Sequence, residues 1–554
     1  MLKNFKHIVM MAGAIVICAS CTDYLTSAPV GSLSPDGFYN SEAHVEQGVL
    51  GVYSKIRGIE DNQYMIFSND RSDDKFVNPT INGVRTCSEV AFLRINSTVG
   101  EISSLWSGWY SLIYNANSVL ENMEGVEFKD ESLKNQYKGE LYFLRGWAHM
   151  ELARTFGNVP IVDHVLSVNE AKELEQSAPA AVMAAAIADL KLAESLLPEE
   201  SGMKDSGGAK IGGQGRADKI VAEAMLARAY MTLKGFPFND ASAKADAKTY
   251  LEKVLNYSKN NGDKYWAPTF KEWGKQYMTD PSTANKYQIF SIQHTKTAGT
   301  PFSTDSGTEL HGADDEGREY LPYGKGGSLM SEAWLDVSMY YEYSRTGDKR
   351  GEGFAYLNGY KAFGSTTSDY VNPKITFKYN GETITDYSQS IITKWIPYPK
   401  KREAFGVVWD DVADGTAWPV NFPILRLEDM QLYYAELLVE DNKIADAMGY
   451  VNKIRTRAGI EAVPTNCSAA DALAYVKRER RLELFMEGVR WFDQVRYGEW
   501  KELTLAKYSR HDVDGKPGLG IAPENVIDGR HFIPIPFTQM SAVPGLYTQN
   551  EGWH

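Results

Sequence analysis

Apolar residues recur every three or four positions along much of the chain, a spacing that places them on one face of a helix. The clearest case begins at Glu101 and carries an apolar stripe of Ile102, Leu105, Trp106, Trp109, Ile113, Ala116, Leu120 and Met123. A second stripe follows and stops near Gly157; it consists of Leu141, Leu144, Ala148 and Leu152. The pattern therefore predicts two long helices early in the chain.

Helical spacing continues through most of the remaining sequence. Ser41 is placed to cap a helix that reaches about Arg57. Further helices are predicted over 180–197, 218–233, 241–258, 428–440, 444–458 and 469–498. They come as neighbouring pairs, with small residues at Ala222, Ala227 and Ala229 where close packing needs them. This pattern predicts a mostly α fold, a helical-repeat scaffold of tetratricopeptide-like helix pairs.

The segment 259–422 has a different character, because it is rich in Gly, Tyr, Trp, Pro and Thr. Strand-like pieces at 374–379 and 391–396 predict small β-hairpins among long loops. We therefore expect a single body over 37–554, with its helical scaffold at about 37–258 and 423–554 and a loop-rich, ligand-binding insertion at about 259–422. Long loops on a rigid scaffold are where binding residues concentrate.

The N-terminus has the pattern of a secretory signal. Lys3 and Lys6 precede an uncharged apolar run over 8–19, which is shorter than the roughly 20 residues that a membrane-spanning helix needs. Small residues precede Cys21 in the stretch 18–21 (CASC), which resembles a lipobox, although Cys18 stands where Leu is usual. A redox role for this CxxC would need a strand-to-helix context that a signal lacks. We predict a lipoprotein signal at 1–20, lipid attachment at Cys21, and a polar tether at 21–36.

Charge and composition narrow the possible partners. The 554 residues include 58 Lys and Arg against 72 Asp and Glu, a net charge of -14, which argues against nucleic acid as a ligand. The same charge gives no attraction to an anionic membrane surface, so membrane attachment must be covalent or hydrophobic. The 32 Tyr and 12 Trp either fill a large core or serve as flat platforms for sugar rings, and composition leaves both open.

Three carboxylates at Glu479, Glu483 and Glu487 recur every four residues and are expected on one helix face. Their candidate partners are the nearby cations Arg480, Arg481, Arg490 and Arg496. A catalytic interpretation would make Glu483 and Glu487 an acid–base pair, because glycosidases use two carboxylates across a cleft. Residues one turn apart on a single helix do not easily flank a sugar from both sides, so a structural role is favoured.

Other catalytic and metal-binding patterns are missing from the sequence. Residues 212–215 (GGQG) lack the Gly-Lys-Ser/Thr of a phosphate loop, and a flexible entry to the next helix is favoured. The nine His residues form no HExxH motif or Cys/His cluster, so zinc is not expected. Acidic clusters at 70–74 and 314–316 lack EF-hand spacing, which favours solvated loop charge over calcium. Whether Cys87 and Cys467 pair stays open. We predict no cofactor, no metal and no catalytic residues.

Several segments together are similar to a known family and occur in that family's order. They are 21–25 (CTDYL), 143–148 (FLRGWA), 154–160 (RTFGNVP), 215–219 (GRADK), 452–459 (NKIRTRAG) and 479–493 (ERRLELFMEGVRWFD). Across nearly the whole mature chain, the sequence resembles the SusD/RagB family of outer-membrane nutrient-binding lipoproteins. The resemblance implies a surface-exposed lipoprotein that sits as a lid on a SusC-like TonB-dependent transporter barrel and passes glycans, or sometimes peptides, to it.

The resemblance also implies ligand-binding loops in two regions of the chain. The loop 69–97 offers polar partners for sugar hydroxyls at Asp70, Asp74, Arg94 and Asn96. The region 266–323 offers rings and polar edges at Trp273, Tyr277, His311, Tyr320 and Tyr323. The expected function is glycan binding without bond chemistry. A secreted glycoside hydrolase and a helical scaffold or peptide-binding lipoprotein are the alternatives.

Overall fold

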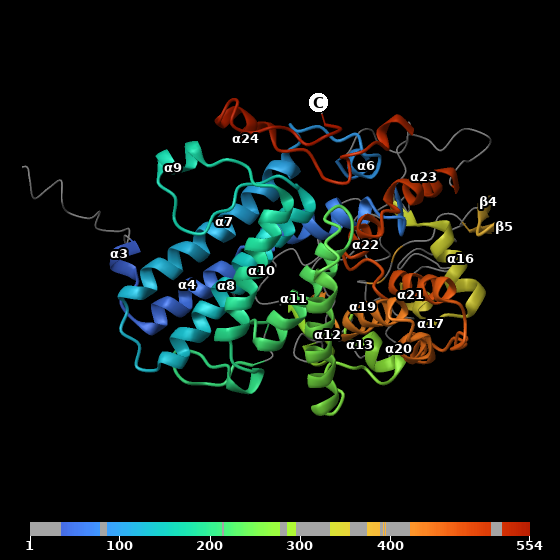
Figure 1. The fold of residues 1–554 in the computed structure, drawn as a ribbon, viewed down its shortest axis with the longest axis horizontal. Coiled ribbons are helices and arrows are strands. Elements are labelled where there is room, and N and C mark those ends of the chain that lie inside the picture. Colours follow the sequence, from blue (N-terminus) through green and yellow to red (C-terminus); the bar gives the residue numbers. More distant parts are fainter. Residues whose placement is uncertain are drawn as a thin grey trace, which may run out of the picture.

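Helices make up most of the part of the chain that is described by the structure, a computed structural model (Figure 1). The described residues are 35–77, 86–212, 215–277, 285–294, 333–354, 374–387, 392, 394, 421–510 and 523–553. None of the helices in these ranges combines the length and the apolar character that crossing a membrane requires.

The first helices follow the predicted stripes closely. Helix α4 (Glu42–Ser54) begins after Ser41, whose side chain accepts a hydrogen bond from the backbone N–H of His44. The chain continues through α5 (Arg57–Glu60) and a π-helical segment (Asp61–Asp70), so the first helix ends before Arg57. The two long helices are α7 (Gly100–Asn122) and α8 (Glu131–Thr155), as predicted.

Helix α8 lies at the centre of the N-terminal half. Almost every residue from Gln136 to Thr155 is buried, because α4, α7 and α10 (Pro179–Leu196) all pack against this helix. Trp147 stacks edge-on against Trp109 of α7, with ring centroids 5.7 Å apart. A helix that is buried on all sides shows no polar face, which is why its sequence has little amphipathic contrast.

The later helices continue the packing as a series. Helix α10 contacts α11 (Lys219–Lys234), which contacts α12 (Ala243–Asn260). Helix α12 contacts α19 (Leu427–Glu440), and α20 (Ile444–Ala458) and α21 (Ala469–Glu483) complete the series. Ala222, Ala227 and Ala229 are fully buried where α11 meets its neighbours. The predicted mostly α, helical-repeat fold is confirmed, whereas the division of the chain at 258 and 422 stays a prediction.

Short two-stranded sheets join segments that are far apart in the sequence. Strand β1 (Lys75–Val77) pairs with β3 (Ala333–Leu335), and β2 (Phe290–Ile292) pairs with β6 (Phe422–Leu425), both antiparallel. Strands β4 (Lys374–Tyr379) and β5 (Glu382–Tyr387) form a hairpin, as predicted for 374–379. The predicted strand over 391–396 falls almost entirely outside the described residues.

The remaining helices are short and lie mainly around the later part of the chain. They are α3 (Pro35–Phe38), α6 (Thr86–Ala91), α9 (Val168–Glu173), α13 (Phe270–Lys275), α16 (Val337–Thr346), α17 (Lys349–Phe354), α22 (Arg490–Arg496), α23 (Trp500–Arg510) and α24 (Phe537–Ala542). Single turns of 3-10 helix occur at Met123–Gly125, Glu200–Gly202, Asn285–Tyr287 and Pro523–Asn525.

The long helix predicted over 469–498 is wrong, because the chain breaks between α21 and α22. Met486 and Gly488 have φ values of 58° and 68°, which a right-handed helix cannot accommodate. A Cβ atom on Gly488 would lie 2.6 Å from Cδ1 of Tyr64, so only glycine fits this turn. The turn is held by Ser68, whose hydroxyl donates a 2.7 Å hydrogen bond to the Gly488 carbonyl. Glu487 therefore leaves the helical face it was expected to share.

Candidate ligand-binding region

Four of the nine residues expected to bind ligand lie inside the protein. Asp70 and Asp74 are buried: the Asp70 carboxylate is 2.6 Å from Nζ of Lys75, and Asp74 accepts a 2.9 Å hydrogen bond from Nε of Arg481. The acidic cluster at 70–74 is thus not the solvated loop charge that was expected. Asp73 and Asp74 are matched by cations from α21 and α22, more than 400 residues further along the chain.

Asp73 shows how strongly this cluster is tied to the C-terminal helices. Its two carboxylate oxygens accept hydrogen bonds of 2.6 and 3.0 Å from Arg490. Although burial acts to raise the pKa of Asp73, the positive charges of Arg481 and Arg490 hold that pKa below its usual value. A carboxylate that is buried and paired in this way is a structural link, with no lone pair facing solvent.

The two aromatic residues expected as sugar platforms are also interior. The Trp273 ring is fully buried, and its Nε1–H donates a 2.8 Å hydrogen bond to Glu483. The Tyr277 hydroxyl donates a 2.9 Å hydrogen bond to Glu487, and burial raises the pKa of Tyr277 well above its usual value. Both rings therefore position the carboxylates of the C-terminal segment and present no face to solvent.

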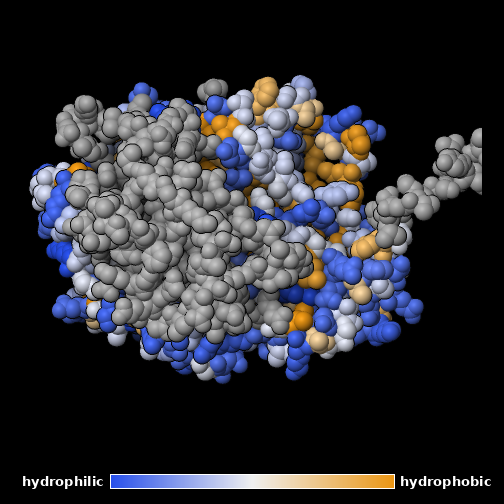
Figure 2. Space-filling view, turned by 180° about the vertical axis from the view of Figure 1, so that it is seen from behind, coloured by the Kyte–Doolittle hydropathy of each residue, from blue (hydrophilic) through white to orange (hydrophobic). Residues whose placement is uncertain are grey.

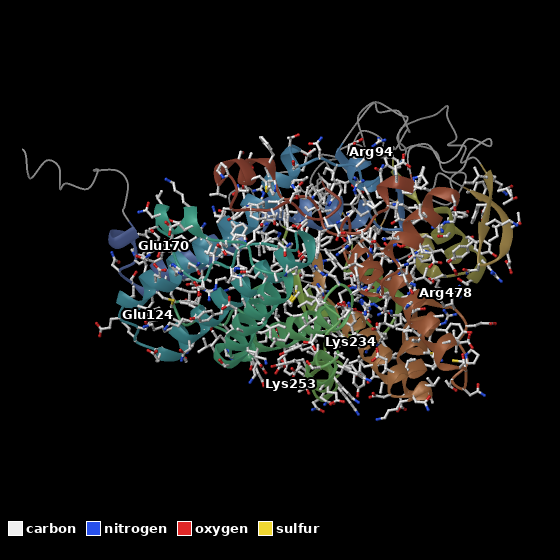
Figure 3. All side chains as sticks on the ribbon, turned by 45° about the horizontal axis from the view of Figure 1, so that its top comes forward. Arg94, Glu124, Glu170, Lys234, Lys253 and Arg478 are labelled. Carbon is white, nitrogen blue, oxygen red and sulfur yellow. The ribbon has the colours of Figure 1, made fainter. Side chains whose placement is uncertain are left out.

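Arg94 and Asn96 do lie at the surface. The Arg94 side chain is 33% exposed and pairs with Glu89 at 2.7 Å, while Asn96 accepts a 2.9 Å hydrogen bond from the Thr98 backbone. Figure 3 places Arg94 on the opposite side of the molecule from Lys253. His311, Tyr320 and Tyr323 lie outside the described residues.

An exposed aromatic ring next to Asn96 was missed by the sequence analysis. The backbone N–H of Phe537 donates a 2.8 Å hydrogen bond to the Ser97 carbonyl, and the Phe537 side chain is 55% exposed. The described surface seen from behind in Figure 2 is mainly hydrophilic, with hydrophobic residues in separate patches on the side that carries the N-terminal helices. Nothing in the local sequence distinguishes an exposed ring such as Phe537 from a ring in the core.

The three glutamates expected on one face of α21 are the centre of a buried charge cluster. Glu483 lies 2.9, 2.9 and 2.6 Å from guanidinium nitrogens of Arg350, Arg426 and Arg457. The remaining contacts of the cluster are Glu479 with Arg350 and Arg455, and Glu487 with Lys394 and Arg426. We call Glu479, Glu483, Glu487 and these five cations the glutamate cluster.

The expected partners of these glutamates were wrong. Arg480, Arg481, Arg490 and Arg496 point away and bind other carboxylates, namely Asp493, Asp73, Asp74 and Glu436. Arg480 and Arg481 leave α21 on other faces than the glutamates, because successive residues of a helix point in different directions. Arg490 and Arg496 belong to α22, beyond the break in the chain. The cations that reach the glutamates come from α17, the N-cap of α19, α20 and residue 394.

The glutamate cluster has none of the properties of an acid–base pair. Glu483 is fully buried, and although burial acts to raise its pKa, Arg457, Arg426 and Arg350 hold that pKa below its usual value. Such a carboxylate carries no proton to donate near neutral pH and accepts bonds on both oxygens. Within the described ranges, no three or more His, Cys, Asp or Glu side chains are grouped so that they could hold a metal ion.

Helix pairs packed in series, with short two-stranded sheets joining distant segments, define a helical-repeat scaffold, and comparison with protein families identifies it. The family model described as "SusD family" matches residues 236–553. A second model, described as "Starch-binding associating with outer membrane", matches residues 23–231. The chain therefore belongs to the SusD family, as its motifs indicated.

Individual relatives agree along nearly the full length. SusD-like protein P25 of Formosa agariphila is 23% identical over 566 residues, covering 98% of both chains, and a SusD-like protein of Bacteroides ovatus is 24% identical over 92% of this chain and 86% of its own. A SusD homolog from Bacteroides thetaiotaomicron superposes with a TM-score of 0.75 at 20% identity, over 95% of this chain and 99% of that one. A laminarin-binding SusD-like protein gives 0.65 at 22% identity, over 93% and 100%. These superpositions show a shared fold.

Proposed function

We propose that this protein is a lipoprotein, anchored to the outer membrane through Cys21 and exposed at the cell surface. It binds an extracellular glycan and delivers it to a SusC-like TonB-dependent transporter barrel. The observation that carries the proposal is the family match, which spans residues 23–231 and 236–553 and includes a starch-binding description. The lipoprotein signal predicted at 1–20 and the similarity to a laminarin-binding SusD-like protein support the same conclusion.

Binding takes place without cleavage of the glycan. The one carboxylate pair that the sequence offered for hydrolysis, Glu483 and Glu487, is buried and saturated by cations. At the surface, Arg94 and Asn96 offer donors and acceptors for sugar hydroxyls, and Phe537 offers an apolar ring for the C–H face of a sugar. His311, Tyr320 and Tyr323 stay predicted members of this binding surface.

Calorimetric titration of the mature protein with laminarin, starch oligosaccharides and a charged polysaccharide tests the proposal. We expect binding to at least one neutral glycan and no release of reducing ends over the same incubation. Release of reducing ends would establish the hydrolase alternative. A protein that binds none of these glycans and no peptide would be a scaffold.

A matched pair of arginine variants locates the surface site. Arg94→Ala combined with Asn96→Ala should weaken glycan affinity about tenfold, because each loss removes roughly one hydrogen bond. Arg478→Ala is the control, since Arg478 is also 33% exposed and paired with one glutamate, Glu342, but lies elsewhere on the surface (Figure 3). Equal affinity in all three proteins would remove Arg94 and Asn96 from the site.

The anchor is tested separately from the binding site. Replacing Cys21→Ser should abolish fatty-acid labelling and release the protein from the outer membrane, while glycan affinity in solution stays the same. Protease treatment of intact cells should degrade the wild-type protein. Retained labelling in the variant would show that Cys21 is not the lipidated residue.

A further inference from the structure

One side of α7 faces solvent over most of its length and carries no charge. Its exposed and half-buried side chains, which we call the α7 face, are Ser104, Ser107, Ser111, Tyr114 and Ser118. The charged residues of this helix are Glu101 at its start and Glu121 near its end. A surface helix normally presents charged side chains to solvent, and serine is a weaker helix former than Ala, Glu or Lys. Helix stability therefore does not explain the composition of this face.

The edge of the α7 face is fixed by a neighbouring segment of the chain. The Tyr110 hydroxyl donates a 2.8 Å hydrogen bond to the Pro160 carbonyl, and the Asn117 amide donates a 2.9 Å hydrogen bond to the His164 carbonyl. Tyr114 lies between Tyr110 and Asn117 on adjacent turns of the helix, so these three residues share one side of α7. The position of Tyr114 is therefore set by a border that is held on both sides of it.

Two aromatic rings at this surface are open to solvent. The side chains of Tyr114 and Phe537 are 54% and 55% exposed. Among the described residues, neither ring stacks on another ring or is covered by a cation. Because the faces of aromatic rings pack against the C–H faces of sugars, both rings are available as platforms for a carbohydrate.

The two rings mark the ends of one surface. The backbone N–H of Phe537 donates a 2.8 Å hydrogen bond to the Ser97 carbonyl, and the hydroxyls of Ser103 and Thr538 lie 3.4 Å apart, so α24 lies against the start of α7 (Figure 1). Tyr114 follows eleven positions after Ser103 in the same helix. With a rise of 1.5 Å per residue, the surface between the rings is roughly 16 Å long. This length accommodates several sugar units in a row.

The hydroxyls between the rings are free to bind a ligand. The side chains of Ser107 and Ser111 make no hydrogen bond to any described residue, and both reach the surface. The amides of Gln276 and Gln288 also lack hydrogen-bond partners among the described residues, but these side chains are only 1% and 3% exposed and lie in the interior. A serine hydroxyl both donates and accepts hydrogen bonds, as a sugar hydroxyl does.

The chemistry of the α7 face favours a neutral carbohydrate. A phosphate, sulfate or carboxylate ligand would find no cation on this face to pair with. The cores of protein interfaces are enriched in large apolar and aromatic residues that pack together, whereas serines separate the two rings here. Open rings with hydroxyls between them match the alternating C–H faces and hydroxyls of a sugar chain.

We propose that an extended, neutral glycan chain lies along the α7 face, between a ring platform at Phe537 and a second platform at Tyr114. The Phe537 end is continuous with the surface at Asn96, and the serine hydroxyls bind the sugar units between the two rings. This inference rests on the proposed glycan-binding function and specifies its ligand as a chain of several sugars.

A series of oligosaccharides of increasing length tests the proposal. The probes are β-1,3-linked and α-1,4-linked glucose oligosaccharides from the disaccharide to the heptasaccharide, titrated by calorimetry into the mature protein. Affinity for the linkage that binds should rise with length until the chain reaches Tyr114, and then level off. Tyr114→Ala should weaken binding of the longest oligosaccharide about fivefold, because one ring platform is lost. Binding of the shortest oligosaccharide with measurable affinity should be unchanged.

Three further variants serve as controls. Tyr114→Phe keeps the ring and should bind every length as the wild type does. Phe537→Ala removes the first platform and should weaken all lengths. Leu505→Ala removes another exposed apolar side chain, 39% exposed, from α23 toward the other end of the molecule (Figure 1), and should have no effect on binding. Thermal unfolding should be unchanged in Tyr114→Ala and Leu505→Ala, since both positions are exposed.

The outcomes separate the α7 face from the proposed function. If the wild type binds glycan and Tyr114→Ala matches it at every length, the α7 proposal is overturned and the proposed function stands. An equal loss at all lengths would also overturn an extended path. If the wild type binds neither the oligosaccharides nor laminarin or starch, the proposed function itself fails. If Tyr114→Ala binds glycan normally but no longer co-purifies with a transporter barrel, the α7 face is a protein interface and the glycan proposal is wrong.

Discussion

Buried polar groups are fully paired in the glutamate cluster, whereas the buried amide of Gln288 has no hydrogen-bond partner among the described residues. Around Glu483, three guanidinium groups and the Trp273 indole satisfy the carboxylate. Around Gln288, a buried amide keeps both of its polar atoms unpaired among the described residues. Helix α13 contacts both regions, because Trp273 bonds to Glu483 of the cluster and Glu272 lines a pocket whose wall includes Gln288.

The difference indicates which buried polar residues stabilise the fold. A saturated buried charge holds distant segments together, and removing one partner leaves the others uncompensated in the interior. An unsatisfied buried amide costs stability, so replacing it with an apolar side chain of similar size is nearly neutral. Pairing, rather than residue type, therefore determines how much a buried polar residue contributes to the stability of this protein.

The largest effect is expected at the centre of the glutamate cluster. Glu483→Ala leaves Arg350, Arg426 and Arg457 without their shared carboxylate and should lower the free energy of unfolding by about 4 kcal/mol. Urea denaturation measures the loss. The control Glu175→Ala, an exposed position, should change stability by less than about 0.5 kcal/mol. If Glu483→Ala is as stable as this control, the ion pairs of Glu483 do not contribute to the free energy of unfolding.

The turn that brings Glu487 into the cluster is the next most sensitive position. Gly488→Ala combines a left-handed backbone with a collision against Tyr64 and should cost about 3 kcal/mol. Gly498→Ala shares the left-handed φ, at 72°, but nothing lies within 4 Å of its added Cβ. It should cost only about 1 kcal/mol. Equal losses in thermal unfolding would show that the contact with Tyr64 is unimportant.

Buried histidines outside the glutamate cluster make the stability of the folded protein depend on pH. Burial lowers the pKa of His149 to about 3 and that of His531 to about 3, so both are neutral in the folded protein. The unfolded chain takes up protons near pH 6.5, and stability should therefore fall as pH drops from 6.5 toward 3. Each histidine contributes about 1.4 kcal/mol per pH unit in that window.

The histidine prediction is checked by urea denaturation at pH 7, 6 and 5. His149→Gln keeps an acceptor for the Val162 backbone N–H. This variant should reduce the slope of the unfolding free energy against pH by the contribution of one histidine. If the variant and the wild type lose stability in parallel, His149 does not titrate in the unfolding reaction.

A smaller effect separates the interior Trp273 from a sugar platform. Trp273→Phe keeps a ring but removes the Nε1–H bond to Glu483, which should cost about 1.5 kcal/mol of stability. Glycan affinity should be unchanged, because the ring is fully buried. A loss of glycan affinity with unchanged stability would show that Trp273 contacts the ligand and is not only an interior residue.

The smallest effects on stability are expected for the amides. Gln288→Leu and Gln276→Leu should each change the free energy of unfolding by less than about 1 kcal/mol in the absence of sugar. Thermal unfolding measures both variants against the wild type. A loss much larger than this in either variant would show that its amide makes a contact that stabilises the fold.

Much of the scaffold could be predicted because its helices are amphipathic. The helix predicted over 444–458 matches α20 (Ile444–Ala458), and Ser41 caps α4 where the sequence placed it. The break after α21 could not be predicted in the same way. Its apolar stripe of Leu482, Phe485, Met486, Val489 and Phe492 continues through the break and is buried throughout, so periodicity alone gives no signal of the turn.

The binding residues were harder to predict than the fold because burial there depends on long-range partners. Trp273 meets Glu483 and Asp73 meets Arg490 only after the chain has folded. Local sequence shows aromatic and acidic residues in a loop-rich region, and these types suit a ligand surface as well as a core.

The direct packing of α12 against α19 has a consequence for how such proteins diversify. The chain leaves the scaffold at one of these helices and re-enters at the other, so the intervening segment begins and ends at neighbouring points. The entropic cost of closing a loop rises slowly with its length, by about 0.6 kcal/mol per doubling. The stretches of this segment that stay outside the glutamate cluster can therefore change in length and chemistry. A chimaera that grafts a relative's segment between α12 and α19 should keep the frame only if the graft again supplies partners for the cluster, as Arg350, Lys394 and Trp273 do here.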